Sequence, residues 1–137
     1  MSEPTHIFVY GTLRPGSGHP MARRLASQAR LVGKGSVPGH LYDLGWYPAA
    51  LFDGDDKSRI VGDVFALIPG NRLLAELDEY EAGDPNYART PLQVSLADGG
   101  TVAAWAYGIV KAPKARLIQG GDFIAHRNAK RPRPVRS

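Results

Sequence analysis

Glycine and proline interrupt this chain so often that much of it can form only short elements. The 137 residues include 16 glycines and 11 prolines. Six of these lie close together, at Gly33, Gly35, Pro38, Gly39, Gly45 and Pro48. Such spacing predicts short strands joined by tight turns, centred on residues 31–32 and 40–42.

Longer strands are predicted on either side of this stretch. Residues 6–10 (HIFVY) and 59–68 are apolar on both faces, as expected of strands that are buried on both sides. Gly62, in the middle of the second, indicates a bulge or a close backbone approach. Residues 87–96 alternate in polarity, and a turn at residues 98–100 (DGG) makes 101–110 their hairpin partner. A short turn and strand are expected at residues 118–123.

Two segments have the period of a helix. One begins at Pro20, which suits a first helical turn, and the other follows Asn71, which suits an N-cap over residues 72–80. The residues expected to face inward are Met21, Leu25 and Ala29 in the first helix and Leu73, Leu77 and Tyr80 in the second. This mixture predicts an α+β fold, namely a small mixed, mostly antiparallel β-barrel of about six strands with two main helices packed outside.

The positive charge is concentrated at the C-terminal end. Lysine and arginine total 17 against 13 acidic residues, which gives a net charge of +4. Five cations and no acids fall within the last eleven residues, so the rest of the chain carries a net charge of −1. We therefore divide the chain into a domain over 1–126 and a basic, proline-rich tail over 127–137, and we do not expect nucleic-acid binding to be its main role.

Composition also limits the compartment and the chemistry. The chain has no cysteine, which excludes disulfides, thiolate metal sites and a cysteine nucleophile. It has no apolar run of the roughly 18 residues that a membrane helix needs, and its first residues lack the pattern of a secretory signal. A cytoplasmic protein without membrane contact is expected.

The first candidate site is the loop Tyr10-Gly11-Thr12-Leu13. It leaves a buried strand, so its backbone N–H groups are free to face a ligand, and glycine lets a ligand come close. The alternative is a simple corner between strand and loop. The spacing of the glycines does not match a phosphate-binding loop.

The second candidate is the predicted helix end at residues 77–81 (LDEYE), with residues 87–89 (YAR) after it. Asp78 and Glu81 are three residues apart and share a helix face. The negative end of the helix dipole raises the pKa of a carboxyl there, which suits acid–base chemistry. The alternative is a solvated helix end. No histidine has a spacing to these acids that suits a metal site.

These two segments, in this order, resemble the γ-glutamylcyclotransferase-like family, and especially its small γ-glutamylamine cyclotransferase-type members. The matching residues are 9–16 (VYGTLRPG), 39–49 (GHLYDLGWYPA), 61–65 (VGDVF), 77–81 (LDEYE), 87–89 (YAR), 105–107 (WAY) and 121–123 (GDF). The resemblance covers nearly the whole chain, and the first and fourth pieces are its most specific pair.

The resemblance implies a compact barrel and a lyase-type or acyltransferase-type enzyme that releases 5-oxoproline from a γ-glutamyl amine or amino acid. It places the catalytic glutamate on Glu81 and the substrate-binding loop on Tyr10, Gly11, Thr12 and Leu13. Arg89 is expected to pair with Glu81 or to face the substrate. No metal or organic cofactor is implied.

Three other functions stay open. The chain could bind a γ-glutamyl ligand without turnover, tailor one γ-glutamyl group within a biosynthetic pathway, or associate with nucleic acid through its tail. A small γ-glutamyl compound is the expected partner, and a monomer or weak homodimer is the expected assembly.

Overall fold

The structure is a computed structural model. It describes residues 4–15, 17, 19–44, 48–54, 57–70, 72–81, 87–109, 111 and 113–130, without the side chains of 81, 119, 129 and 130.

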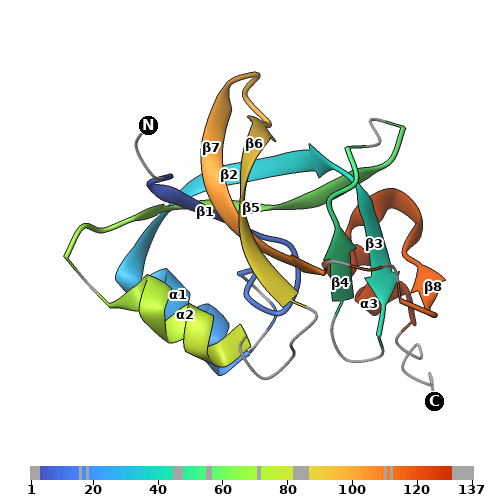
Figure 1. Ribbon diagram of the computed structural model, residues 1–137, viewed down its shortest axis with the longest axis horizontal. Coiled ribbons are helices and arrows are strands. Elements are labelled where there is room, and N and C mark those ends of the chain that lie inside the picture. The colour runs from blue at the N-terminus through green and yellow to red at the C-terminus, as the bar shows by residue number, and fades with distance from the viewer. Residues whose placement is uncertain are drawn as a thin grey trace, which may run out of the picture.

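Five strands close into a barrel in the order β1, β5, β2, β6 and β7 (Figure 1). They are β1 (His6–Val9), β2 (Ala29–Pro38), β5 (Arg59–Leu67), β6 (Tyr87–Leu96) and β7 (Thr101–Ile109). Neighbouring strands are antiparallel except β1 and β7, which pair in parallel where Ile7 lies beside Trp105. The predicted α+β fold with a mostly antiparallel barrel is confirmed.

Three further strands form a separate small sheet in the order β4, β3 and β8. They are β3 (His40–Asp43), β4 (Pro48–Leu51) and β8 (Arg116–Leu117). The described residues thus contain eight strands, and five of them form the barrel, for which about six were expected. The two strands joined by the predicted hairpin, β6 and β7, have the expected pairing.

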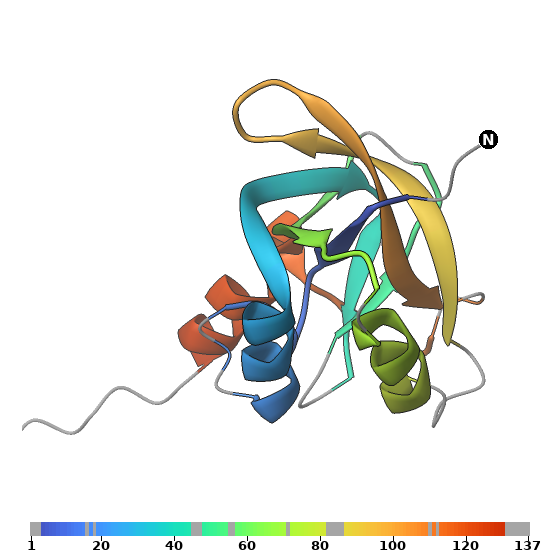
Figure 2. The same cartoon turned by 90° about the vertical axis from the view of Figure 1, so that its left-hand side faces the viewer.

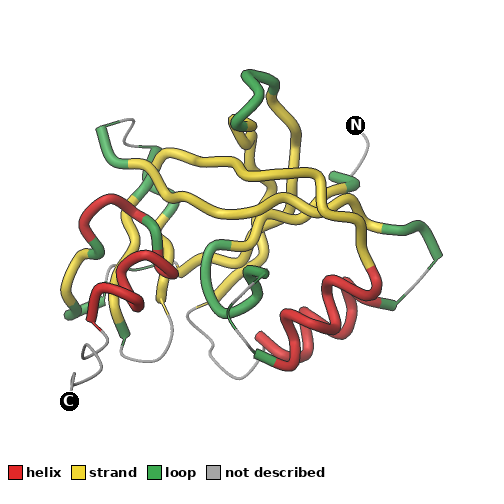
Figure 3. Tube along the Cα trace, turned by 180° about the vertical axis from the view of Figure 1, so that it is seen from behind, coloured by secondary structure: helices red, strands yellow, loops and turns green. Residues whose placement is uncertain are grey.

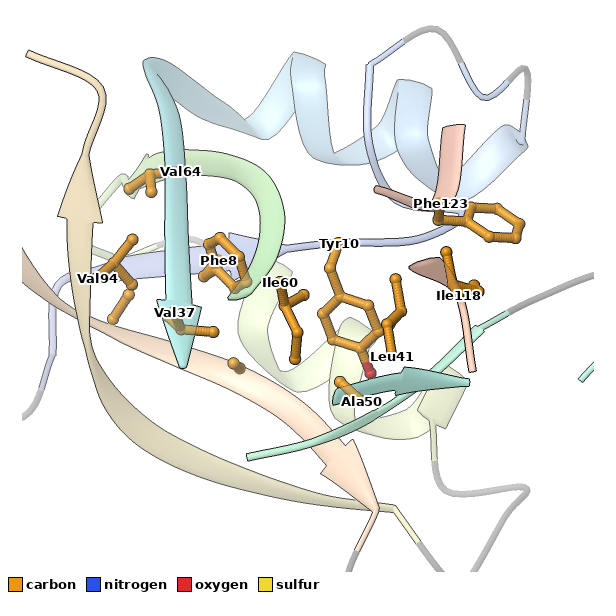
Figure 4. Packing of buried hydrophobic residues seen from close by; sticks show 12 residues of the cluster. Phe8, Tyr10, Val37, Leu41, Ala50, Ile60, Val64, Val94, Ile118 and Phe123 are labelled. Atoms are coloured by element: carbon orange, nitrogen blue, oxygen red, sulfur yellow. The ribbon is translucent and has the colours of Figure 1, made fainter. Parts of the chain in front are cut away.

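The barrel interior is filled by every second residue of its strands. Phe8 of β1 points inward, next to Val64 and Val94, whereas Ile7 and Val9 belong to a different buried cluster. Figure 4 shows that the inner cluster continues beyond the five barrel strands through Tyr10, Leu41, Ile118 and Phe123. The small sheet and the C-terminal segment therefore cover one end of the barrel.

Two helices, α1 (Pro20–Gln28) and α2 (Leu73–Glu81), lie side by side against the outside of the barrel (Figure 2). Leu25, Leu73 and Leu77 are buried there, as predicted. Tyr80 is 40% exposed, so its predicted inward position is wrong. Its ring lies edge-on to His19, the N-cap of α1, with Tyr80 Oη 3.2 Å from His19 Nε2. Asn71, the predicted N-cap of α2, lies outside the described residues.

A turn and a strand were predicted at residues 118–123, and the strand is wrong, because a helix follows the turn instead. A 3₁₀ turn, η1 (Gln119–Gly121), leads into a third helix, α3 (Phe123–Lys130). The Asp122 carboxylate accepts a hydrogen bond from Ala125 N (3.0 Å), which satisfies a free N–H of the first helical turn. Figure 3 shows α3 at the opposite end of the molecule from α1 and α2. The helix crosses position 126, so the first four residues of the expected tail are helical.

The glycines of β2 do not end the strand, although short strands were expected there. β2 continues through Gly33, where its pairing with β5 shifts register, and through Gly35. A Cβ at Gly35 would lie 2.6 Å from Val94 Cγ1, so glycine makes room for the packed interior. The close approach predicted at Gly62 is confirmed, because a Cβ there would lie 2.2 Å from Val9 O.

The described helices have eight or nine residues, and none has the length and apolar character of a membrane span.

Candidate active site

The loop after β1 is pressed against the start of β4. A Cβ on Gly11 would lie only 2.6 Å from Pro48 Cγ, so no larger residue fits without movement. The carbonyl oxygen of Pro48 in turn accepts a hydrogen bond from the Tyr87 hydroxyl at the start of β6 (2.9 Å). The loop is also tightly turned, because Arg14 N donates to Gly11 O at 3.0 Å. The predicted ligand loop therefore lies where three elements converge.

Three successive backbone N–H groups of this loop have no recorded acceptor among the described residues. They belong to Gly11, Thr12 and Leu13. Nearly all backbone N–H groups in folded proteins are paired with protein or water. Consecutive unpaired N–H groups are what an anion-binding loop needs, and substrate binding by this loop stays a prediction.

The side chain of Tyr10 turns away from solvent into the protein. The residue is 7% exposed, and its hydroxyl donates to the carbonyl oxygen of Tyr107 (Figure 4). Its ring also lies edge-on to Phe52, with ring centroids 6.0 Å apart. The side chain thus holds the beginning of the loop in place, and the predicted contact of Tyr10 with substrate is one that its backbone would make.

The loop and α2 are joined by one buried cluster. Leu13 packs in it together with Leu73 and Leu77 of the helix and with Tyr107 of β7. α2 ends at Glu81, whose side chain lies outside the described part of the structure. The backbone thus brings the predicted catalytic position and the predicted ligand loop to one region.

Asp78 connects α2 to the barrel. Its Oδ1 accepts a hydrogen bond from the Tyr107 hydroxyl at 2.6 Å. Because Tyr107 O accepts the hydrogen bond of Tyr10, a chain of contacts runs from the first residue of the loop to the last turn of the helix. These contacts fix the distance between the two halves of the candidate site.

Arg89 has a partner that the sequence did not indicate. Its Nη1 lies 3.2 Å from Asp78 Oδ2, and its guanidinium lies over the ring of Trp105, 4.5 Å from the ring centre. The arginine was expected to pair with Glu81 or to face the substrate. Its cation balances Asp78, the acid one turn before Glu81. The Glu81 side chain lies outside the described part of the structure, so pairing with Glu81 and a direct role in substrate binding both stay predictions.

The sequence did not reveal a group of buried polar residues that hold the end of the loop in place. Arg14 is only 5% exposed, and its guanidinium contacts the carboxylates of Asp63 and Asp122, each at 2.8 Å. One signal was present in the sequence: Asp63 is a lone acid within the apolar strand 59–68. A buried carboxylate requires a cation or several donors, so a search for its partner could have identified Arg14.

A cavity of about 360 Å³ lies elsewhere, between the start of β3, the start of β5 and η1. Its lining includes His40, Arg59, Ile118 and Gly121, and none of the residues Tyr10 to Leu13 or Arg89. No group of three or more histidine, aspartate or glutamate side chains in the described part of the chain is arranged to hold a metal ion.

The fold and the loop agree with one protein family. The family model described as gamma-glutamyl cyclotransferase, AIG2-like, matches residues 7–125. The chain therefore belongs to the AIG2-like γ-glutamyl cyclotransferase family. No curated protein matches the sequence.

Solved structures have the same fold. An AIG2-like protein of Mus musculus (A2LD1, GGACT) is 26% identical, with a TM-score of 0.70 over 88% of this chain and 90% of that one. YkqA of Bacillus subtilis is 23% identical, with a TM-score of 0.72 over 93% of this chain, and the chain spans only 42% of its length. A γ-glutamyl cyclotransferase is 15% identical, with a TM-score of 0.58 over 85% of this chain and 73% of that one. The last two likenesses concern the fold alone.

Proposed function

We propose that this protein is a cofactor-independent γ-glutamyl cyclotransferase, which converts a γ-glutamyl amine or γ-glutamyl amino acid to 5-oxoproline and a free amine. One observation carries the proposal. The N–H groups of Gly11, Thr12 and Leu13, which have no acceptor within the described part of the chain, lie on a loop that shares a buried cluster with α2, the helix that ends at Glu81. Family membership supports the type of reaction.

The reaction is an internal acyl transfer. The α-amino nitrogen attacks the side-chain carbonyl carbon, and a new C–N bond closes a five-membered lactam. The bond from that carbon to the departing nitrogen breaks. The attacking nitrogen loses two protons between the ammonium and the lactam N–H: one is released to solvent, and the other is transferred to the leaving amine. Because the nucleophile and the carbonyl belong to one molecule, the enzyme needs only to fold the substrate and to move this proton.

Glu81 is the proton carrier in this proposal. An α-ammonium group with a pKa of about 8 is mostly protonated at neutral pH, and removing its proton costs only ~1.4 kcal/mol. The harder step is the departure of an amide nitrogen, which leaves readily only after protonation. A single carboxylate that accepts the first proton and returns it to the leaving nitrogen serves both steps.

The N–H groups of Gly11, Thr12 and Leu13 are the electrostatic part of the proposal. They would donate to the carboxylate of the glutamyl group or to the oxyanion that forms when the nitrogen attacks. Preorganised donors of this kind are often worth about 3 kcal/mol per donor in the transition state. The contacts of Gly11 with Pro48 and of Tyr10 with Tyr107 keep such donors from reorganising.

A substrate screen tests the proposal. The wild-type protein is incubated with γ-glutamyl amines, γ-glutamyl dipeptides and glutathione, and 5-oxoproline is measured by chromatography. We expect time-dependent 5-oxoproline with an equal amount of free amine from at least one of them. Calorimetric binding without product would contradict the proposal and would favour the non-catalytic binding protein.

A further inference from the structure

Arg14 directly follows the candidate ligand loop and is buried, which is rare for an arginine. It is 5% exposed. Its Nε donates to Asp63 Oδ2 and its Nη1 to Asp122 Oδ1, both at 2.8 Å. A buried cation is stable only when it is paired and hydrogen-bonded, and here two carboxylates hold one guanidinium.

The two carboxylates come from parts of the fold that are themselves fixed. Asp63 lies in β5, is 7% exposed and pairs in register with Val9, the last residue of β1. Asp122 precedes α3, where its carboxylate also accepts the hydrogen bond of Ala125 N. The guanidinium of Arg14 is therefore held between the barrel wall and the first turn of the C-terminal helix.

Because the side chain of Arg14 is held in place, its backbone also constrains the turn that precedes it. Arg14 N donates to Gly11 O at 3.0 Å, and Arg14 O accepts from Ser17 N at 3.2 Å. The three N–H groups that find no acceptor among the residues the structure describes belong to this turn, at Gly11, Thr12 and Leu13. Their directions follow from where the backbone of Arg14 is held.

A second set of contacts reaches the same turn from α3. The Ser17 hydroxyl donates to Thr12 O at 2.5 Å, and Arg127 Nη1 donates to Ser17 O at 3.3 Å. The Arg127 guanidinium also lies 5.6 Å from the ring centre of Phe123. The loop after β1 passes close to α3 in Figure 2, so two independent contacts bind them together.

We propose that Arg14 is a positioning residue, which together with Asp63 and Asp122 sets the direction of the loop N–H groups and does not bind substrate itself. Two observations favour positioning over ligand binding. The side chain of Arg14 is only 6% exposed, and both of its ion pairs among the described residues are with carboxylates. The kinetic part of the test rests on the proposed cyclisation, and the structural part does not.

The test uses two mild variants of the full-length protein. Arg14→Lys keeps the positive charge but replaces the planar fork with a single ammonium, which cannot hold both carboxylates in the same way. Asp122→Asn keeps an oxygen that can cap α3 but removes one of the two negative charges. Two controls accompany them: Arg24→Lys changes an arginine in an exposed ion pair, and Val94→Ala destabilises the barrel interior away from the loop.

Two quantities are measured below the melting temperature of every variant. Amide hydrogen exchange at positions 14 and 17 is followed by NMR, because these two N–H groups make the hydrogen bonds of the turn. Michaelis–Menten kinetics of 5-oxoproline release gives kcat and KM separately. In Arg14→Lys and Asp122→Asn we expect exchange at these amides to be at least about tenfold faster and kcat/KM to fall by about 10- to 100-fold. Neither control should show these changes.

A merely structural role predicts a different result. If both variants lose melting temperature while exchange at positions 14 and 17 and kcat/KM remain as in the wild type, the positioning role is wrong. If the wild-type protein forms no 5-oxoproline at all, the proposed function fails. The exchange measurement then still decides whether Arg14 orders the turn.

Discussion

At the scale of single residues, the candidate site depends on a few side chains that hold the backbone rather than on many that face a ligand. Tyr10, Arg14 and Tyr107 are all buried, and each makes a hydrogen bond that fixes the loop or the helix beside it. An enzyme that works through backbone N–H groups needs this kind of support, because those donors act only when their direction is set in advance.

Gly11→Ala tests how closely the loop is held against β4. A Cβ at this position would lie 2.6 Å from Pro48 Cγ, so the loop or Pro48 must move. We expect a loss of about 1–3 kcal/mol in the free energy of unfolding, with a decrease in 5-oxoproline formation that is larger than the stability loss explains. Gly100→Ala is the control, since its Cβ would lie no closer than 3.3 Å from Asp98 Oδ1 and 3.8 Å from Leu96 Cδ1. Equal effects of the two substitutions would contradict the close fit.

Tyr107→Phe tests the contact between the barrel and the end of α2. It removes the hydroxyl that donates to Asp78 Oδ1 at 2.6 Å. We expect the free energy of unfolding, measured with urea, to fall by about 1 kcal/mol, because the lost hydrogen bond is to a carboxylate that is partly exposed. Tyr80→Phe is the matched control on an exposed tyrosine and should change stability by less than about 0.5 kcal/mol. A stable Tyr107→Phe variant would show that this contact does not hold α2.

At the scale of elements, the position of α2 sets the position of Glu81, and α1 helps to hold α2. Arg24 and Glu76 form an exposed two-point ion pair between these helices, with hydrogen bonds of 3.0 and 2.8 Å. The hydrogen bond from Arg24 lowers the pKa of Glu76 below its ordinary value, against a smaller effect of burial. The pair links the two helices outside the buried cluster.

The lowered pKa gives this ion pair a definite dependence on pH. A carboxyl whose pKa is lower in the folded state stabilises the fold above its unfolded pKa, and that contribution is lost as pH falls through the folded pKa. Glu76→Gln should therefore lower the melting temperature slightly at neutral pH, and the difference from the wild type should shrink as the pH falls through the folded-state pKa of Glu76, which lies below its ordinary value. Glu79→Gln, an exposed acid on the same helix, is the control. A wild-type advantage that persists at low pH would contradict the assignment.

The elements show what could and could not be predicted from the sequence. Strands β1, β5, β6 and β7 were predicted because alternation and apolar runs report burial directly. The continuation of β2 through Gly33 and Gly35 was not, because the closeness of Val94 that requires a glycine exists only in the folded barrel. α3 was missed because its first residue, Phe123, is buried by contacts distant in sequence.

Within the site, the loop and the helix end could be found as motifs. The contacts of Arg14 could not, because its two partners lie 49 and 108 positions further along the chain.

At the scale of the whole molecule, the described part of the C-terminal region, residues 122–130, packs against the rest of the domain. Phe123 is 1% exposed in the barrel interior, and Asp122 and Arg127 contact the loop after β1. The division at position 126 that the charge pattern suggested falls inside α3. Residues 131–137 lie outside the described residues, and their partners stay a matter for prediction.

Two truncations test this picture of the C-terminal end. Deletion of all residues after Asn128 retains Asp122, Phe123 and Arg127, so we expect a folded protein with the kcat/KM of the wild type. Deletion of all residues after Gly121 removes all three, and we expect it to unfold, because a large buried side chain and a partner of a buried cation are lost together. Circular dichroism and 5-oxoproline release are the measurements. A large loss of turnover in the shorter deletion would show that the removed residues help to shape the site.

The central claim is that Glu81, at the end of α2, moves the proton in the cyclisation. The most direct measurement compares Glu81→Gln with the wild type and with Glu79→Gln, using the substrate that gives most 5-oxoproline. Glutamine keeps the size of the side chain and removes its ability to carry a proton, so kcat should fall by at least about 100-fold with an unchanged melting temperature. Glu79→Gln should retain full turnover. Wild-type turnover in Glu81→Gln would contradict the account.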